Sequence, residues 1–275
     1  MSKTILTSPN DSVLVETRDA VAWITINRPN SLNAINRDIV AALKTVTSAI
    51  QDNTMIRAVV LGGKGEHFMA GGDIKYFKGI LDDEPDKSTL HDEFEGLLTE
   101  VHEVILNMRR MSQPIVAAVH GAVAGAGVSF MLACDLVIAA EDSYFNLAYC
   151  HLGVSPDGGS TYALPRITGM KRAFEIALLG DRFDAATAEK WGLINRVVPS
   201  GDVETAVDDL AARLAQGPTR AHAHTKALLN ASFKHSLVEQ LNAETESFTD
   251  CTTTDDFVEG VNAFLKKRQP EFRGR

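Results

Sequence analysis

Two glycine-rich turns, about fifty residues apart, have the composition of a site that binds a carbonyl oxygen. They are residues 68–75 (FMAGGDIK) and 120–127 (HGAVAGAG), and each follows an apolar strand pattern and precedes a helix pattern. The first N–H groups of a helix lack an intrahelical acceptor and carry a partial positive charge, and glycine and alanine let an oxygen atom approach them closely. Two such turns lying together would form an oxyanion hole.

A third turn, residues 152–160 (LGVSPDGGS), carries Asp157 just before another helix pattern. An aspartate in that place can simply cap the helix.

The three cysteines, Cys134, Cys150 and Cys251, have no metal-like spacing, so we expect neither a metal site nor a disulfide.

The elements that must position these turns alternate between strands and helices. Apolar patterns predict strands at 13–16, 21–27, 58–62, 115–119, 136–140 and 144–146, an amphipathic helix at 37–51 and a long helix ending near Arg110. Between them, residues 78–87 lose their periodicity and fill with charge, which predicts a mobile surface loop. The pattern is that of an α/β protein.

After Gly158 the chain reads as successive helices, with a strand-like segment at 193–198 and a polar break near residue 200. We therefore expect an α/β core over residues 1–200 and a C-terminal helical module over residues 201–275. Val207, Leu210 and Leu214 form an apolar stripe, and a small helical module could not fully bury such a stripe against its own helices. We expect this stripe to contact a neighbouring subunit.

The composition limits the function. The chain has 275 residues, of which 45% are hydrophobic, and 27 basic against 36 acidic residues give a net charge of −9. This balance disfavours binding to nucleic acid or to an anionic membrane. No apolar run is long enough to span a bilayer and no signal pattern is present, so a cytoplasmic location is expected.

Several motifs resemble the crotonase family, the enoyl-CoA hydratases and isomerases, over nearly the whole chain. They are residues 24–29 (ITINRP), 32–35 (LNAI), 70–75, 121–135, 178–180 (LLG), 191–198 (WGLINRVV) and 259–265 (EGVNAFL), with Arg268. The resemblance implies a spiral of ββα units followed by a C-terminal helical module, assembled as a trimer or as a hexamer of paired trimers.

The resemblance also assigns the oxygen-binding groups. It implies that the N–H groups of Gly72 and Ala126 hold the carbonyl of a CoA thioester, with no metal or redox cofactor, since CoA is part of the substrate. Contacts with the CoA or acyl group fall, by the same resemblance, on Ala70, Gly72, Asp73, Ile74, Lys75, Tyr149, Phe264 and Lys267. The last two often contact CoA from a neighbouring subunit.

Hydratases of this family use two glutamates to hold one water, and here the matching positions are Ser129 and Tyr149. A serine and a phenol cannot orient and deprotonate water as two carboxylates do. In the isomerases of the family a single Asp or Glu stands at the position of Asp157 and carries a proton between two carbons. The resemblance therefore favours double-bond isomerisation of an enoyl-CoA with Asp157 as the proton carrier.

Three alternatives stay open. One is a hydratase with an unusual acid and base. Another is a relative of the 4-chlorobenzoyl-CoA dehalogenases, whose Asp is a nucleophile; His102 matches their histidine, but Tyr149 stands where they carry a tryptophan. The third is an inactive homologue that binds acyl-CoA or RNA, against which the acidic balance and the retained Asp157 both argue. Structural roles are expected for His120 and His151.

Overall fold

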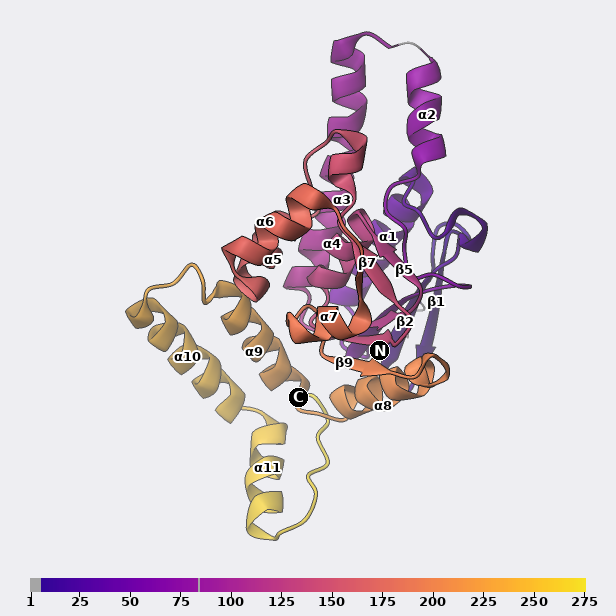
Figure 1. Cartoon of the computed structure of the whole chain (residues 1–275). Helices are drawn as coiled ribbons and strands as arrows, with labels where there is room; N and C mark the ends of the chain where they lie inside the picture. Colours follow the sequence, from indigo (N-terminus) through magenta and orange to yellow (C-terminus); the bar gives the residue numbers. More distant parts are fainter. Residues whose placement is uncertain (1–5, 84) are drawn as a thin grey trace.

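Two β-sheets carry the segments that contain the glycine turns (Figure 1). The computed structural model describes residues 6–83 and 85–275. In the larger sheet the strand order is β1-β2-β3-β4-β6-β9, and every neighbouring pair is parallel except β1 with β2. Its strands are β1 (Val13–Arg18), β2 (Val21–Ile26), β3 (Ala58–Gly63), β4 (Ile115–Val119), β6 (Leu136–Ala140) and β9 (Arg196–Val198).

The smaller sheet has the order β5-β7-β8, with β5 (Ala122–Ala124) parallel to β7 (Tyr144–Asn146) and β8 (Phe183–Asp184) antiparallel to β7. The chain leaves β4 in the large sheet, enters β5 in the small sheet and then forms α4; it repeats this course from β6 through β7 to α5. Each repeat is one ββα turn of a spiral. The predicted α/β fold, a spiral of ββα units, is confirmed.

The helices follow from apolar spacing and from their caps. In α1 the buried residues Ile39, Leu43, Val46 and Ile50 recur at helical spacing, and the Asn36 side chain accepts the Ile39 N–H at 3.1 Å. The helices are α1 (Arg37–Gln51), α2 (Ile74–Asp82), α3 (Lys87–Arg110), α4 (Ala126–Ala133), α5 (Ser160–Thr168), α6 (Met170–Leu179), α7 (Ala185–Lys190), α8 (Val203–Ala215), α9 (Thr219–Ala231), α10 (Leu237–Thr252) and α11 (Asp255–Leu265), with short 3-10 turns at Pro29–Ser31, Tyr149–Leu152 and Ser200–Asp202.

One predicted loop is partly helical. The charged segment 78–87 contains the second half of α2 and the start of α3; Asp83, Pro85 and Asp86 lie in neither helix, and Glu84 lies outside the described residues. The helix forms because the Asp73 carboxylate accepts the N–H groups of Lys75 and Tyr76 at its start. Together α2 and α3 form a hairpin that projects beyond the sheets (Figure 1).

The large sheet is covered on both faces. Residues of α1, α3 and α4 pack on one face in the main core, whereas α8 packs on the other face against β3, β4 and β6. Val207 and Ala211 of α8 are fully buried there, and Leu210 and Leu214 are partly buried beside them. The expectation that this stripe contacts a neighbouring subunit is therefore wrong, because the chain's own sheet buries it. The predicted boundary at residue 200 comes just before α8, although α8 packs on the large sheet.

A buried lysine joins α9 to the part of the chain that contains the two sheets. Lys226 of α9 donates hydrogen bonds to the carbonyls of Met108 (2.9 Å) and Gln113 (3.0 Å) and pairs with the Asp135 carboxylate at 2.7 Å. Burial lowers the pKa of the Lys226 ammonium, and Asp135 opposes this shift. Removing one partner of such a pair would leave an uncompensated buried charge. The contact helps to hold α9 on the body, together with the hydrogen bonds from Arg57 to Thr219 and from Asn230 to the Arg109 carbonyl.

Beyond α9, helices α10 and α11 extend away from the sheets (Figure 1). Large apolar side chains remain exposed on them, including Leu237, Val238, Phe248 and Phe264. Large apolar side chains exposed in such number on neighbouring helices are typical of surfaces that contact another molecule. Among the residues described, no helix combines the length and apolar character needed to cross a membrane.

The position of α8 can be tested with Val207→Ala. Because Val207 is fully buried against the sheet, we expect the change to lower the free energy of unfolding by about 1–3 kcal/mol without altering the oligomeric state. Thermal melting and light scattering measure the two effects. Dissociation of an oligomer with no loss of stability would contradict this account.

Candidate active site

The two glycine turns lie side by side because their backbones pair. Met69 donates its N–H to the Ala122 carbonyl at 3.2 Å, and Ala124 donates its N–H to the Met69 carbonyl at 3.0 Å. This parallel bridge between Met69 and Val123 extends the small sheet and brings the segment before α2 against the segment before α4. Segments about fifty residues apart thus meet at the point where two helices begin.

Glycine is required at this contact. Gly71 and Gly125 have φ of +87° and +49°, a region that side chains disfavour. A Cβ on Gly71 would lie 3.2 Å from the Ala124 carbonyl oxygen, and one on Gly127 would lie only 2.1 Å from the Met69 carbonyl oxygen. Any larger residue would push the two turns apart.

The predicted oxyanion donors, the N–H groups of Gly72 and Ala126, lack acceptors in the part of the chain that the structure describes. Ile35 donates to the Gly71 carbonyl and accepts from the Asp73 N–H, so the intervening Gly72 N–H points away from this bridge. Ala126 is the first residue of α4, where an N–H has no intrahelical acceptor. Within the described part of the chain, neither of these two N–H groups has a hydrogen-bond acceptor. Both are available to a ligand oxygen; their joint role as an oxyanion hole stays a prediction.

Asp157 lies beside α4 and does not cap α5. The helix cap is Gly159, with no side-chain cap bond. Instead the Tyr149 hydroxyl donates to Asp157 Oδ1, while the hydroxyls of Ser129 and Ser160 each donate to the Asp157 carbonyl at 2.9 Å. The positions that hold two glutamates in hydratases thus both contact Asp157. Oδ2 of Asp157 accepts no hydrogen bond from any described residue and is available to a substrate.

Tyr149 acts here as a hydrogen-bond donor. Burial raises the pKa of its phenol well above the ordinary value, and the neighbouring Asp157 carboxylate raises it further. The phenol therefore stays protonated at neutral pH. Because the proton is directed at Oδ1, the phenol orients the Asp157 carboxylate and leaves Oδ2 without a hydrogen-bond donor among the described residues.

The histidines contact backbone groups. His102 Nε2 accepts the Gly158 N–H at 3.4 Å, His120 Nε2 lies 3.0 Å from the Gly65 carbonyl, and His151 Nε2 lies 3.2 Å from the Gly180 carbonyl. The structural roles expected for His120 and His151 agree with these contacts. Only His102 touches the turn that carries Asp157.

The predicted CoA segment divides into an internal part and an exposed part. The Asp73 carboxylate is occupied, since it caps α2 and pairs with Arg28 at 2.9 Å. Burial would raise its pKa, but Arg28 and the N–H groups of α2 outweigh burial and lower it. Ala70 donates its N–H to the Leu32 carbonyl at 3.0 Å. Ile74 and Lys75 are exposed beside Gly72 and are free to meet a ligand.

Phe264 and Lys267 are not brought to this site by their own chain. Phe264 lies on α11, at the opposite end of the molecule from α2 (Figure 1), and is 83% exposed. Any contact of this pair with a ligand at Gly72 therefore needs a second subunit.

Two site contacts were missed from the sequence. The first is the ion pair between Arg28 and Asp73. Its signal in the sequence was the presence of an arginine in the motif 24–29 (ITINRP) and of an aspartate in the glycine turn 68–75. Ser160 follows Asp157 by three residues, which is the spacing at which a hydroxyl reaches back to a carbonyl, and it does so here.

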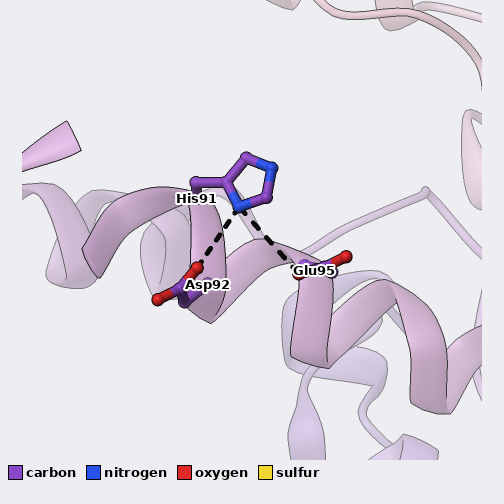
Figure 2. A group of neighbouring side chains, drawn as sticks. All are labelled: His91, Asp92 and Glu95. Carbon is purple, nitrogen blue, oxygen red and sulfur yellow. Dashed lines mark hydrogen bonds and ion pairs between the residues drawn. The ribbon is translucent and has the colours of Figure 1, made fainter. Parts of the chain in front are cut away.

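A group of possible metal ligands lies outside this site. His91, Asp92 and Glu95 gather on the outer surface of α3 (Figure 2), and their reactive atoms lie within 4.8 Å of one another. All three side chains are at least 70% exposed. Their closeness follows from helical spacing, and His91 lies 3.3 Å from Asp92 as a solvated surface pair of little energetic weight.

Comparison with known proteins identifies the family. The sequence pattern named Enoyl-CoA hydratase/isomerase matches residues 16–275. The chain belongs to that family. The resemblance to the crotonases is thereby confirmed, and an acyl-CoA substrate is consistent with it.

Individual relatives carry different activities in their names. A probable enoyl-CoA hydratase of Rhodobacter capsulatus is 37% identical over 266 residues, covering 96% of this chain and 98% of the relative. The 1,2-epoxyphenylacetyl-CoA isomerase of Escherichia coli K12 is 33% identical over 265 residues, with coverage of 96% and 98%. The crystal structure of an enoyl-CoA hydratase from Polaromonas sp. JS666 superposes with a TM-score of 0.88 at 32% identity, covering 95% of this chain and 99% of that one.

The contact between the turns predicts different outcomes for two glycine substitutions in this family member. Gly127→Ala should lower the free energy of unfolding by about 1–3 kcal/mol and reduce activity, because its methyl group collides with the Met69 carbonyl. The control is Gly79→Ala on α2, where no atom lies within 4 Å of a new Cβ and a gain of about 0.5–1 kcal/mol is expected. Melting curves measure both. Equal stability of the two variants would show that the turns do not need this approach.

Proposed function

We propose that this enzyme moves a double bond along the acyl chain of an enoyl-CoA thioester. The observation that carries the proposal is the set of contacts around Asp157. Ser129 and Tyr149, the two residues that stand at the positions of the hydratase glutamates, both contact it, and its Oδ2 accepts no hydrogen bond from any residue that the structure describes. One carboxylate with one free oxygen suits a reaction that takes a proton from one carbon and returns it to another.

The proposed reaction needs two kinds of group. The N–H groups of Gly72 and Ala126 donate to the thioester oxygen, which gains negative charge when a proton leaves the substrate. Asp157 Oδ2 takes that proton, and the C–H electron pair enters the conjugated enolate. The same oxygen then returns the proton to a different carbon of the enolate, so the double bond is displaced and no atom is lost or gained.

A hydratase with an unusual acid and base is the second candidate, favoured by the names of several relatives. Against it stands the direction of the two hydroxyl protons: Ser129 donates to the Asp157 carbonyl and Tyr149 to the Asp157 carboxylate, so neither proton is left to orient an attacking water. Dehalogenation is less supported, since Tyr149 donates a hydrogen bond to the carboxylate that would have to act as nucleophile.

Asp157→Asn tests the proposed proton carrier. An asparagine keeps an Oδ1 that can accept the Tyr149 hydroxyl, so folding and acyl-CoA binding should persist while turnover of a 3-enoyl-CoA falls by on the order of 10²–10⁴. Product analysis by mass and a melting curve give the two readings. Asp209→Asn, on the exposed side of α8, is the control for loss of a charge. A variant that isomerises at the parent rate would refute this role.

The assembly is also a proposal, namely a trimer or a pair of trimers in which Phe264 and Lys267 of one subunit contact CoA bound to the next. The exposed apolar side chains of α10 and α11 and the distance of α11 from Gly72 in one chain support it. Light scattering at micromolar concentration should give three or six subunits, and Phe248→Asp should shift the protein toward smaller species by placing a charge in an apolar contact. A monomeric parent protein would contradict the proposal.

A further inference from the structure

The peptide group between Asp157 and Gly158 is hydrogen-bonded on both of its sides. Its carbonyl oxygen accepts the hydroxyls of Ser129 and Ser160, each at 2.9 Å, and the Ser160 N–H at 3.2 Å. Its N–H, which belongs to Gly158, is donated to Nε2 of His102 at 3.4 Å. Because the C=O and the N–H of a planar trans peptide point in opposite directions, these partners hold the group from two sides.

The orientation of this peptide group sets the direction of the Asp157 side chain. The peptide plane turns only through ψ of Asp157 and φ of Gly158, so holding the plane also holds the backbone from which the carboxylate projects. The turn is tight: Gly158 has φ of +59°, and a Cβ there would lie 2.7 Å from the Ser129 Cβ. The hydroxyl of Tyr149 holds Oδ1 at the other end of the side chain. These contacts together restrict where Oδ2 can lie.

His102 supports the peptide from a rigid helix. Its neighbours Val101 and Val104 are buried in the core, so the backbone of α3 at this point cannot move without disturbing that packing. Among the described residues, the Gly158 N–H has no acceptor other than His102. To accept an N–H at Nε2 the imidazole must be neutral, with its proton on Nδ1. The ring therefore acts as a hydrogen-bond acceptor for the main chain.

We propose that His102 is a positioning residue, which holds the Gly158 N–H and thereby aims Oδ2 of Asp157 at the substrate. This rests on the proposed function, in which Oδ2 carries the proton. His102 acts through the main chain and takes no part in proton transfer itself. The contribution can be large, because a displacement of about 1 Å in a reacting group can cost on the order of 10² in rate.

Two substitutions separate the hydrogen bond from the ring. His102→Gln places an amide oxygen near the position of Nε2, where it can accept the Gly158 N–H, whereas His102→Leu has no acceptor. For a 3-enoyl-CoA we expect His102→Leu to lower kcat by about tenfold to hundredfold with KM changed less than about twofold, and His102→Gln to keep kcat within about threefold of the parent. His91→Leu, an exposed histidine of the same helix, is the control and should change neither constant.

Crystal structures of the parent protein and of His102→Leu test the positioning without the reaction. In the leucine variant the peptide should rotate and Oδ2 of Asp157 should move by about 1 Å. Because the ring of His102 is exposed, melting temperatures should agree within a few degrees, so that a loss of kcat is not a loss of folded protein.

An unmoved Oδ2 in the His102→Leu structure would overturn the proposal. So would an equal fall of kcat in the glutamine and leucine variants, because the hydrogen bond would then not be what supports the rate. A parent protein that isomerises no enoyl-CoA would refute the proposed function instead. In that case a displaced Oδ2 in the leucine variant would still support the positioning role, and an unmoved one would refute it.

Discussion

The site depends on a few backbone hydrogen bonds that join three distant segments. Ile35 pairs with the residues on either side of Gly72, and Met69 pairs with the residues on either side of Val123. Each such bond contributes only about 0.5–1.5 kcal/mol net, but a buried partner left unpaired costs about 1–3 kcal/mol. The pairing persists mainly because breaking it would leave buried main-chain groups unpaired. It orients the N-termini of two helices.

A second constraint acts around Asp157. Its side-chain neighbours are hydroxyl groups, which stay neutral: Tyr149 donates to the carboxylate, and Ser129 and Ser160 donate to the main-chain carbonyl. No charged side chain among the described residues forms an ion pair with this carboxylate. A second carboxylate at the position of Tyr149 would repel Asp157 and would favour sharing a proton or a water between the two. The phenol removes that possibility and holds one oxygen in place. Under the proposed function, the exchange of a carboxylate for a phenol at this position would separate two kinds of proton chemistry on the same backbone.

Sequence patterns were most successful for strands in which nearly every residue is buried. Strands at 58–62 and 115–119 are unbroken apolar runs in the middle of the large sheet, and the structure has them at Ala58–Gly63 and Ile115–Val119. The loop predicted at 78–87 was wrong in its first half, because Tyr76, Phe77 and Ile80 follow helical spacing under the surface charges. The α8 stripe was assigned to a neighbouring subunit because a one-dimensional pattern does not say which apolar surface covers it.

The site was predictable in its parts but not in its contacts. Glycine turns and an aspartate before a helix are local features. The hydrogen bond from Tyr149 to Asp157 crosses an irregular segment in which Ala148 has φ of +53° and Gly153 has φ of +71°, so no periodicity indicates it. Since the groups that are free to bind the carbonyl oxygen are main-chain N–H groups, exchange of side chains leaves them in place. In the proposed reaction, activation of the thioester would therefore not depend on the side chains of Ser129, Tyr149 and Asp157, so that substitutions at these three positions would change the proton chemistry and leave the oxygen-binding groups in place.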